Sequence, residues 1–388
     1  SVYSFSFRLY VGKMKTKYLH LLIVTILIML LFSGCTGERS TEDDTVLETS
    51  YITTESTSVE TTEQSSEDEV SAISYKTLQL IPDNSFQTGF TVWSQKDHNN
   101  GNLFSELGAF QYDATEGKTP TWTLSSWDSG PTELYNDWIA LLDSGAEFSQ
   151  YIMTDGSYRT VVYDPSNNAI SLSLDSSYYY NGRAAAAGDY WPHLLAAQGT
   201  FDYFSMDEET KAYYSCSADK LIVSFDMCMP EYSQTANAKD YVEAAQYYIY
   251  FYVRGRNSSD FVWFGLQLFD SRSENSGYYM GIDGGKADAS GKLIYVIGRS
   301  DLLGNSTGSF WKDKKPYPSD EWYHVEIDVV PYLERAFNLG QAYYSYFSVD
   351  SLDDLVIDGM NFGFELIGTF DVTISIANLE LTSYLSEE

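Results

Sequence analysis

A strand predicted at 247–254 has an unusual second face. Its first face is ordinary, because the apolar residues Ile249, Phe251 and Val253 alternate along it. The opposite face carries three aromatic rings with hydroxyl groups and one guanidinium: Tyr248, Tyr250, Tyr252 and Arg254. Such a surface suits flat amphipathic ligands, which stack on the rings and hydrogen-bond to the polar groups. An ordinary sheet surface is the alternative, because Tyr favours strands and packs across them.

The next predicted strand, 261–270, enlarges this face. Trp263 and Gln267 alternate with its apolar residues, and a strand at 293–299 could add Tyr295 and Arg299. Aromatic rings stack on the apolar C–H faces of sugars, while amide and guanidinium groups hydrogen-bond to sugar hydroxyls. These residue types therefore point to a carbohydrate ligand.

Two further segments hold candidate ligand-binding residues. Asp270 and Arg272 end the strand 261–270, where the loops of sandwich proteins carry sites, and could clamp hydroxyl groups or an acidic sugar. They could instead form a surface ion pair of small energetic weight. Trp191 and His193 flank a proline, which fixes the chain and would aim an aromatic ring and a hydrogen-bond donor toward a sugar. A structural corner with a hydrogen-bonded His is the alternative.

The sequence offers weaker candidates for catalytic and metal-binding residues than for ligand-binding residues. A glycosidase needs two carboxylates roughly 5 Å or 6.5–9.5 Å apart, and Glu326, Asp328 and Glu365 lie on the less apolar faces of predicted strands. In so acidic a chain, such a set is expected by chance. Cys216 and Cys228 lack partners at zinc spacing and are predicted to be free thiols. We expect no cofactor, although the acidic residues leave room for a structural calcium ion.

These positions imply a body built mostly of strands. Alternation with period two is the signal of a half-buried strand. Outside the strands already named, it recurs at 221–227, 322–329, 360–366 and 372–381. Helices are expected at only two places, 132–143 and 330–339. Many strands with few helices indicate an all-β fold of two packed antiparallel sheets, a β-sandwich of jelly-roll type.

Composition divides the chain. Its net charge of −32, from 55 acidic and 23 basic residues, argues against a nucleic-acid partner, because phosphate binding needs a basic surface. Residues 36–75 hold 11 acidic residues, one base and no apolar periodicity, which predicts a disordered acidic linker rich in Ser and Thr. The sandwich would then span 76–388 as one domain. Its part 76–150, rich in Trp and Gly, is either a first hairpin layer or a loop-rich cap.

The first residues contain a targeting signal. Lys15 and Lys17 precede an apolar run at 19–32, which is too short for a comfortable bilayer span. The run ends in Leu31-Phe32-Ser33-Gly34-Cys35, which resembles the lipobox of bacterial lipoproteins. The resemblance implies a signal peptide at 14–35 and a lipid on Cys35, and therefore an extracytoplasmic protein anchored to the bacterial membrane surface by that lipid alone. Residues 1–13 are expected to be upstream read-through.

The body carries a second resemblance. The segments 191–195, 264–272 and 376–381 are similar to those of jelly-roll proteins of bacterial glycan-use systems, including concanavalin-like lectin and glucanase folds and galactose-binding-like modules. The resemblance implies that a concave sheet or the loops at one end hold a carbohydrate. It departs from the catalytic pattern of the concanavalin-like glucanases, two Glu around an Asp on one strand, because Glu326-Ile327-Asp328 has only half of it.

The leading hypothesis from the sequence is therefore a lipid-anchored surface protein whose sandwich binds a polysaccharide or oligosaccharide without catalysis. A glycoside hydrolase or polysaccharide lyase on the same fold is the first alternative. A non-sugar adhesion or assembly protein, which would present a flat exposed apolar patch, is the second.

Overall fold

The computed structural model describes residues 73–94, 105–110, 119–126, 137–139, 151–155, 158–189, 191–238, 243–272, 277–283, 291–298, 301–302, 319–344 and 347–387. All of them belong to one compact unit, Val70–Glu388. Residues 1–13, the signal peptide at 14–35 with Cys35, and the linker up to residue 72 lie outside the described residues. Within the described ranges, no helix has the length and apolar character that a membrane crossing needs.

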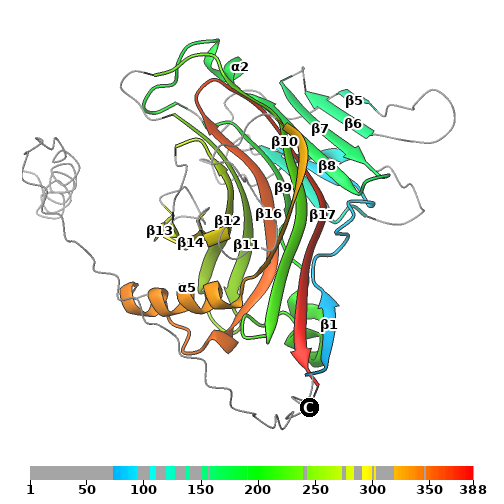
Figure 1. Cartoon of the computed structure of the whole chain (residues 1–388), viewed down its shortest axis with the longest axis vertical. Helices are drawn as coiled ribbons and strands as arrows, with labels where there is room; N and C mark the ends of the chain where they lie inside the picture. Colours follow the sequence, from blue (N-terminus) through cyan, green and yellow to red (C-terminus); the bar gives the residue numbers. More distant parts are fainter. Residues whose placement is uncertain are drawn as a thin grey trace, which may run out of the picture. The chain divides into compact units, whose positions relative to one another are not determined.

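The described strands form two sheets (Figure 1). Sheet A has the order β15-β10-β17-β8-β7-β6-β5, and β1 also pairs with β17. Its strands are β1 (Tyr75–Gln79), β5 (Asp137–Ile139), β6 (Tyr151–Asp155), β7 (Arg159–Asp164), β8 (Ala169–Asp175), β10 (Lys220–Gln234), β15 (Ser319–Asp328) and β17 (Phe370–Ser386). The alternating burial of β7 and β8 shows that one side of this sheet faces the core.

Sheet B has the order β13-β14-β12-β11-β16-β9-β4-β2-β3. Its strands are β2 (Phe90–Ser94), β3 (Ser105–Phe110), β4 (Trp122–Ser126), β9 (His193–Gln198), β11 (Ala244–Gly255), β12 (Phe261–Asp270), β13 (Tyr279–Ile282), β14 (Leu293–Ile297) and β16 (Leu355–Ile367). Long curved strands run through both sheets in Figure 1. The strands described within residues 76–150 extend these same two sheets.

The chain crosses repeatedly from one sheet to the other. β8 lies in sheet A, β9 in sheet B, β10 in sheet A and β11 in sheet B, and the crossing recurs at β15, β16 and β17. Strands that follow one another therefore face each other across the core, which is the connectivity of a jelly roll. The predicted all-β sandwich of jelly-roll type is confirmed.

Two pairs of strands depart from the antiparallel pattern. β2 runs parallel to β4, and β12 runs parallel to β14. A parallel pair needs a crossover connection. For β12 and β14 the crossover includes β13, which lies on the far side of β14 as its antiparallel partner.

The described helices are few and mostly short, as predicted. They are α2 (Ser177–Tyr180), α3 (Glu208–Ala212), α5 (Val330–Tyr343) and the 3₁₀ turns η2 (Tyr203–Ser205) and η3 (Leu352–Asp354). α5 confirms the helix predicted at 330–339, and it begins with a proline in its first turn, where the missing N–H costs nothing. The helix predicted at 132–143 is wrong where it is described, because Asp137–Ile139 is β5 and pairs with β6.

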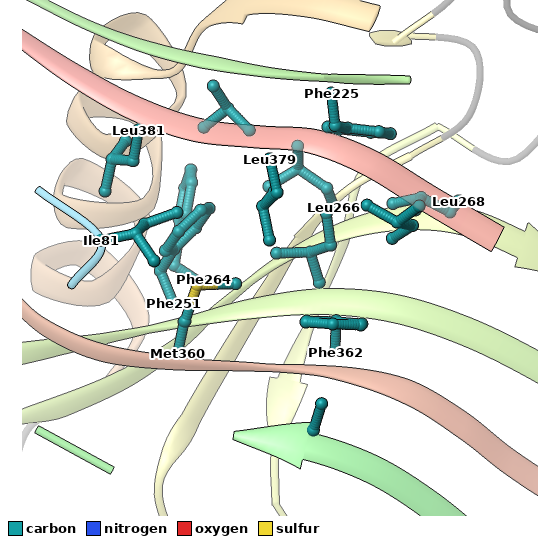
Figure 2. Close-up of a cluster of buried hydrophobic side chains, with 14 of the residues drawn as sticks. Ile81, Phe225, Phe251, Phe264, Leu266, Leu268, Met360, Phe362, Leu379 and Leu381 are labelled. Atoms are coloured by element: carbon teal, nitrogen blue, oxygen red, sulfur yellow. The ribbon is translucent and has the colours of Figure 1, made fainter. Parts of the chain in front are cut away.

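The core fills the space between the sheets (Figure 2). Phe225, Leu379 and Leu381 enter it from sheet A, and Phe251 and Phe362 from sheet B, all with no exposed surface. Burial of this kind stabilises a fold by about 1.5–3 kcal/mol for each large apolar side chain. The two described cysteines, Cys216 and Cys228, are buried free thiols, as predicted.

Candidate functional site

β11 separates its side chains into two chemically different sets. The residues that point into the core, Tyr247, Ile249, Phe251 and Val253, are buried. The alternate residues Tyr248, Tyr250, Tyr252 and Arg254 therefore lie on the outer side of sheet B. The assignment of the two faces from the sequence is confirmed.

Five rings on this outer side touch one another. Tyr248 stacks on Tyr250 with ring centroids 5.4 Å apart, and Tyr250 meets the edge of Trp263 at 6.2 Å. Trp263 also packs edge-on against Tyr252 at 5.0 Å and against Phe261 at 4.7 Å. We call these five residues the aromatic face. Tyr252 is buried and the other four are half-buried.

A glycine on β12 makes room for one of these rings. Gly265 is the cross-strand partner of Tyr250. A Cβ at residue 265 would lie 2.6 Å from Cε1 of Tyr250, closer than atoms of this kind approach. The Tyr250 ring therefore lies flat over the backbone of the neighbouring strand, which keeps the aromatic face continuous between β11 and β12.

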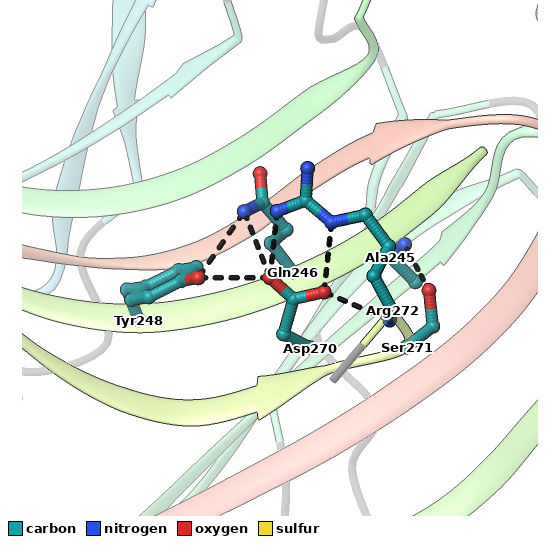
Figure 3. A network of polar contacts seen from close by, with 6 residues as sticks. All are labelled: Ala245, Gln246, Tyr248, Asp270, Ser271 and Arg272. Carbon is teal, nitrogen blue, oxygen red and sulfur yellow. Dashed lines mark hydrogen bonds and ion pairs between the residues drawn. The ribbon is translucent and has the colours of Figure 1, made fainter. Parts of the chain in front are cut away.

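The end of the aromatic face is fixed by a carboxylate (Figure 3). Oδ2 of Asp270 accepts hydrogen bonds from the Tyr248 hydroxyl at 3.0 Å and from Nε2 of Gln246 at 3.1 Å. Arg272 binds the same carboxylate through Nε at 3.0 Å and through Nη2 at 2.7 Å. Asp270 and Arg272, both predicted as ligand-binding residues, are thus bonded to each other in a bidentate pair.

The surroundings of this network determine its protonation. Burial works to raise the pKa of Asp270, but the hydrogen bonds from Arg272 outweigh it and lower the pKa. Burial, and then Asp270, raise the pKa of the Tyr248 hydroxyl. Burial also raises the pKa of Tyr252 to about 12. Both tyrosines therefore remain protonated hydrogen-bond donors at neutral pH.

Arg254 closes the opposite end of the aromatic face. Its guanidinium lies over the rings of Tyr252 and Phe261, 5.9 and 5.6 Å from their centroids. Nη2 donates to the carbonyl oxygen of Gly199 at 3.1 Å, and Nε lies 3.8 Å from the buried carboxylate of Asp358. Both arginines of the predicted site are therefore matched by carboxylates.

Polar side chains of β16 and β9, the next strands of sheet B after β11, extend the site. His193 is the cross-strand partner of Glu365, and Nε2 of His193 lies 3.7 Å from Oε1 of Glu365. Asn361 donates a hydrogen bond to the Tyr252 hydroxyl at 3.1 Å. Gln267, on β12, lies opposite Tyr248 and is buried. The site thus joins an aromatic face on β11 and β12 to a polar flank on β9 and β16.

One donor on the aromatic face is unsatisfied. The indole N–H of Trp263 is shielded from solvent, and no described residue accepts a hydrogen bond from it. Buried donors are nearly always paired with protein, water or ligand. The Trp263 N–H shares this lack of a described partner with other buried groups, among them the Tyr247 hydroxyl in the core.

Trp191, the other tryptophan predicted to bind a ligand, lies at the end of sheet B. It packs with Tyr180 and Ala185 against Ala244 and Ile367. Ala244 and Ile367 are partners in register, two residues beyond Gln246 and Glu365. Trp191 therefore lies beyond the polar flank, at the end of sheet B, and does not join the aromatic face.

Two expectations about the site are wrong. Tyr295 belongs to the core, where it stacks on Phe264 with centroids 5.7 Å apart, because β14 pairs in parallel with β12 and brings these two residues into register. Its suggested companion Arg299 lies outside the described residues. Glu326 and Asp328 cannot pair with Glu365, because β15 belongs to sheet A and β16 to sheet B.

The structure also gives Asp328 a different role. Its Oδ1 accepts hydrogen bonds from the backbone N–H groups of Leu221 and Val330, which ties β10 to the start of α5. Asn361 was missed by the sequence analysis. Its signal is that Asn361, Gly363 and Glu365 alternate with the apolar residues Phe362, Phe364 and Leu366 along the strand. In the described residues no group of three or more His, Cys, Asp or Glu side chains is placed to hold a metal ion.

Comparisons with known proteins find distant likenesses among solved structures. No family profile matches the chain, and no curated protein matches it. Among solved structures, an endoglucanase from Rhodothermus marinus is 7% identical, with 62% of this chain and 93% of that chain covered and a TM-score of 0.31. A family 12 xyloglucanase from Bacillus licheniformis is 10% identical, with coverages of 68% and 99% and a TM-score of 0.32.

A family 11 xylanase from Neocallimastix patriciarum is 13% identical, with 63% of this chain and 94% of that chain covered and a TM-score of 0.31. At such low identities and TM-scores, these likenesses assign no role to any residue of this chain. The candidate site is defined by the contacts within this chain alone.

Proposed function

We propose that this chain is a lipid-anchored extracytoplasmic protein whose β-sandwich binds a carbohydrate on the aromatic face and its polar flank. The observation that carries the proposal is the contiguous set of five rings on the outer side of sheet B. Rings offer sugars a stacking surface, and the polar flank offers donors and acceptors for hydroxyl groups. The anchor is proposed from the lipobox-like sequence that ends at Cys35.

The electrostatics of the site favour a neutral ligand in this proposal. Arg272 is bound by Asp270, and Arg254 faces Asp358, so neither guanidinium is available to pair with an acidic sugar without losing its partner. The whole chain is strongly acidic as well. A neutral polysaccharide avoids both costs.

We propose binding without turnover. Hydrolysis by the usual route requires two carboxylates that act together. Near the aromatic face, Asp270 is committed to Arg272 and Tyr248, which leaves Glu365 beside His193 and Asp283 at the end of β13. The concanavalin-like glucanase pattern of two Glu around an Asp on one strand is also incomplete in this chain, because Glu326-Ile327-Asp328 has only half of it.

The binding proposal is tested by affinity electrophoresis and calorimetry on hydroxyethyl cellulose, xyloglucan, xylan, mannan, pectin and alginate. The loss of a stacking ring in Trp263→Ala is expected to weaken binding about tenfold. Trp322→Ala is the matched control, because Trp322 is an exposed tryptophan on sheet A. Absence of binding to every polymer, or equal effects of the two substitutions, would contradict the proposal.

Catalysis is tested on the same polymers by reducing-sugar release and by the absorbance of unsaturated products. The proposal expects no product from the unaltered protein. Product that disappears in Glu365→Gln would establish an enzyme on this face instead, with Glu365 as an essential group.

A further inference from the structure

A second group of aromatic rings lies at the end of sheet A, between β7 and α2. Tyr178 lies face to face with Tyr158, with ring centroids 4.0 Å apart and an interplanar angle of 7°. Tyr179 stands perpendicular to both, 6.1 Å from Tyr158 and 6.0 Å from Tyr178. We call these three residues the tyrosine platform. Their mutual packing holds the Tyr178 ring in one orientation.

The backbone beneath the tyrosine platform is also well fixed. Asp175 accepts a hydrogen bond from the backbone N–H of Ser177 at 2.9 Å, which secures the start of α2. The helix ends in two left-handed residues, Asn181 and Gly182, and the N–H of Gly182 donates to the carbonyl of Ser177 at 3.1 Å. Hydrogen bonds at both ends of α2 thus fix the backbone that carries Tyr178 and Tyr179.

A buried cation supports the rings from behind. Arg159 has no exposed surface, and its guanidinium lies 5.6 Å from the Tyr158 ring centroid and 5.7 Å from that of Tyr179. Cation–π attraction of this kind is stronger where water is excluded. Tyr158 and Tyr179 are therefore held against the fold, while Tyr178 is their outermost ring.

Tyr178 is half exposed, at 50% of its surface. A single exposed ring is ordinary on a soluble protein. This ring differs because stacking on Tyr158 has already ordered it, so a flat ligand that stacks on it costs little further side-chain entropy. The hydroxyl group of Tyr178 adds hydrogen-bonding capacity. The tyrosine platform therefore has the composition of a sugar-stacking surface.

The platform is connected to the proposed site through packing. Tyr179 and Trp191 both pack against the small cluster that contains Ala244 and Ile367. Those two residues follow the outer row of Gln246 and Glu365 on β11 and β16. Tyr179 of the tyrosine platform and Trp191 beyond the polar flank thus pack against the same buried cluster at the end of sheet B.

We propose that Tyr178 forms a second carbohydrate-stacking subsite, and that the ligand is a polymer that engages this subsite and the aromatic face together. This inference rests on the proposed carbohydrate binding. It adds that the ligand is a polymer long enough to reach both places. Two linked contacts on one polymer raise the overall affinity without any new interaction at either place.

The test compares binding of each soluble neutral polysaccharide with binding of a short oligosaccharide of the same linkage. Tyr178→Ala is expected to weaken binding of the polymer about tenfold and to change binding of the oligosaccharide less than twofold. Tyr178→Phe keeps the ring and should bind like the unaltered protein. Tyr343→Ala is the matched control, because Tyr343 is exposed at 72% on α5. Thermal unfolding midpoints and oligosaccharide binding show that each variant is folded.

The outcomes separate the two proposals. If Tyr178→Ala and Tyr343→Ala bind the polymer equally while Trp263→Ala weakens it, the subsite is refuted and the aromatic face stands. If Tyr178→Ala weakens polymer binding and Trp263→Ala does not, the contact at Tyr178 stands, while the aromatic face and the joint engagement of both places are refuted. A protein that binds no carbohydrate refutes both.

Discussion

At the scale of the residue, Asp270 explains how a charged group can sit within an aromatic surface. Its side chain is only 5% exposed, and donors from Gln246, Tyr248 and Arg272 occupy its oxygens. A buried carboxylate without such partners would be costly. The network therefore fixes the orientation of the Tyr248 ring, and the carboxylate of Asp270 is committed to donors within the protein.

Asp371 shows the opposite situation, a carboxylate without compensating charge. It lies on β17 directly across from Asp175, and Glu231 is near. Burial, followed by repulsion from Glu231 and Asp175, raises the pKa of Asp371 to about 6. Its pKa in the unfolded chain is about 3.9. The folded state therefore binds this proton more tightly, and the stability that the proton contributes below pH 4 is lost as pH rises toward 6.

We predict that Asp371→Asn stabilises the protein at pH 7.5 by about 1 kcal/mol, a figure reduced for partial solvent screening. The gain should shrink as pH falls through 6 toward 4, because the native carboxyl group is then neutral too. Urea unfolding at pH 4.5 and 7.5 measures it. Asp350→Asn, at an exposed position, is the control. A gain of equal size at both pH values would contradict the repulsion.

At the scale of the element, strand faces could be predicted from the sequence where their chemistry contrasts. On β11, apolar residues alternate with Tyr and Arg, so both faces were assigned correctly. On β14 the residues Leu293, Tyr295 and Ile297 share the core face. Because Tyr carries a hydroxyl group, the sequence suggested that Tyr295 belongs to the outer face instead. Alternation identifies which residues share a face, but burial of that face depends on the neighbouring strand.

Membership of a sheet could not be predicted in the same way. Glu326 and Glu365 stand on strands that adjoin in sequence, yet the jelly-roll connection sends β15 to sheet A and β16 to sheet B. The choice of sheet is made by long-range pairing, and no local pattern encodes it. For the same reason the sequence could not show that Trp191 lies beyond the polar flank.

The packing of β11 against β12 yields a prediction. Gly265→Ala places a methyl group against the Tyr250 ring, so the ring must move. We expect a loss of about 1–2 kcal/mol in stability from overpacking, together with weaker carbohydrate binding. Gly277→Ala is the control, since its added Cβ meets no atom within 4 Å. Calorimetry and thermal unfolding measure both effects, and unchanged binding in Gly265→Ala would show that the Tyr250 position does not matter.

At the scale of the whole molecule, the anchor yields a further prediction. The lipobox-like sequence implies that the Cys35 thiol carries the lipid, so Cys35→Ser should move the protein from the membrane fraction to the soluble fraction of the cell. Detergent partitioning and immunoblotting of fractions measure this change. Cys228→Ser is the control, because Cys228 is a buried thiol in β10. A variant at Cys35 that stays with the membrane would exclude lipidation there.

The pairing of β1 with β17 has a consequence for how the fold is reached. Tyr75 to Gln79 pair with residues 382–386, and Gln79 also accepts a hydrogen bond from Leu381 across 302 positions of sequence. Closing a flexible loop of that length costs about 5 kcal/mol of chain entropy. Folds dominated by such distant contacts assemble slowly, on the scale of milliseconds to seconds. During synthesis β1 emerges from the ribosome first, yet it gains its partner strand last.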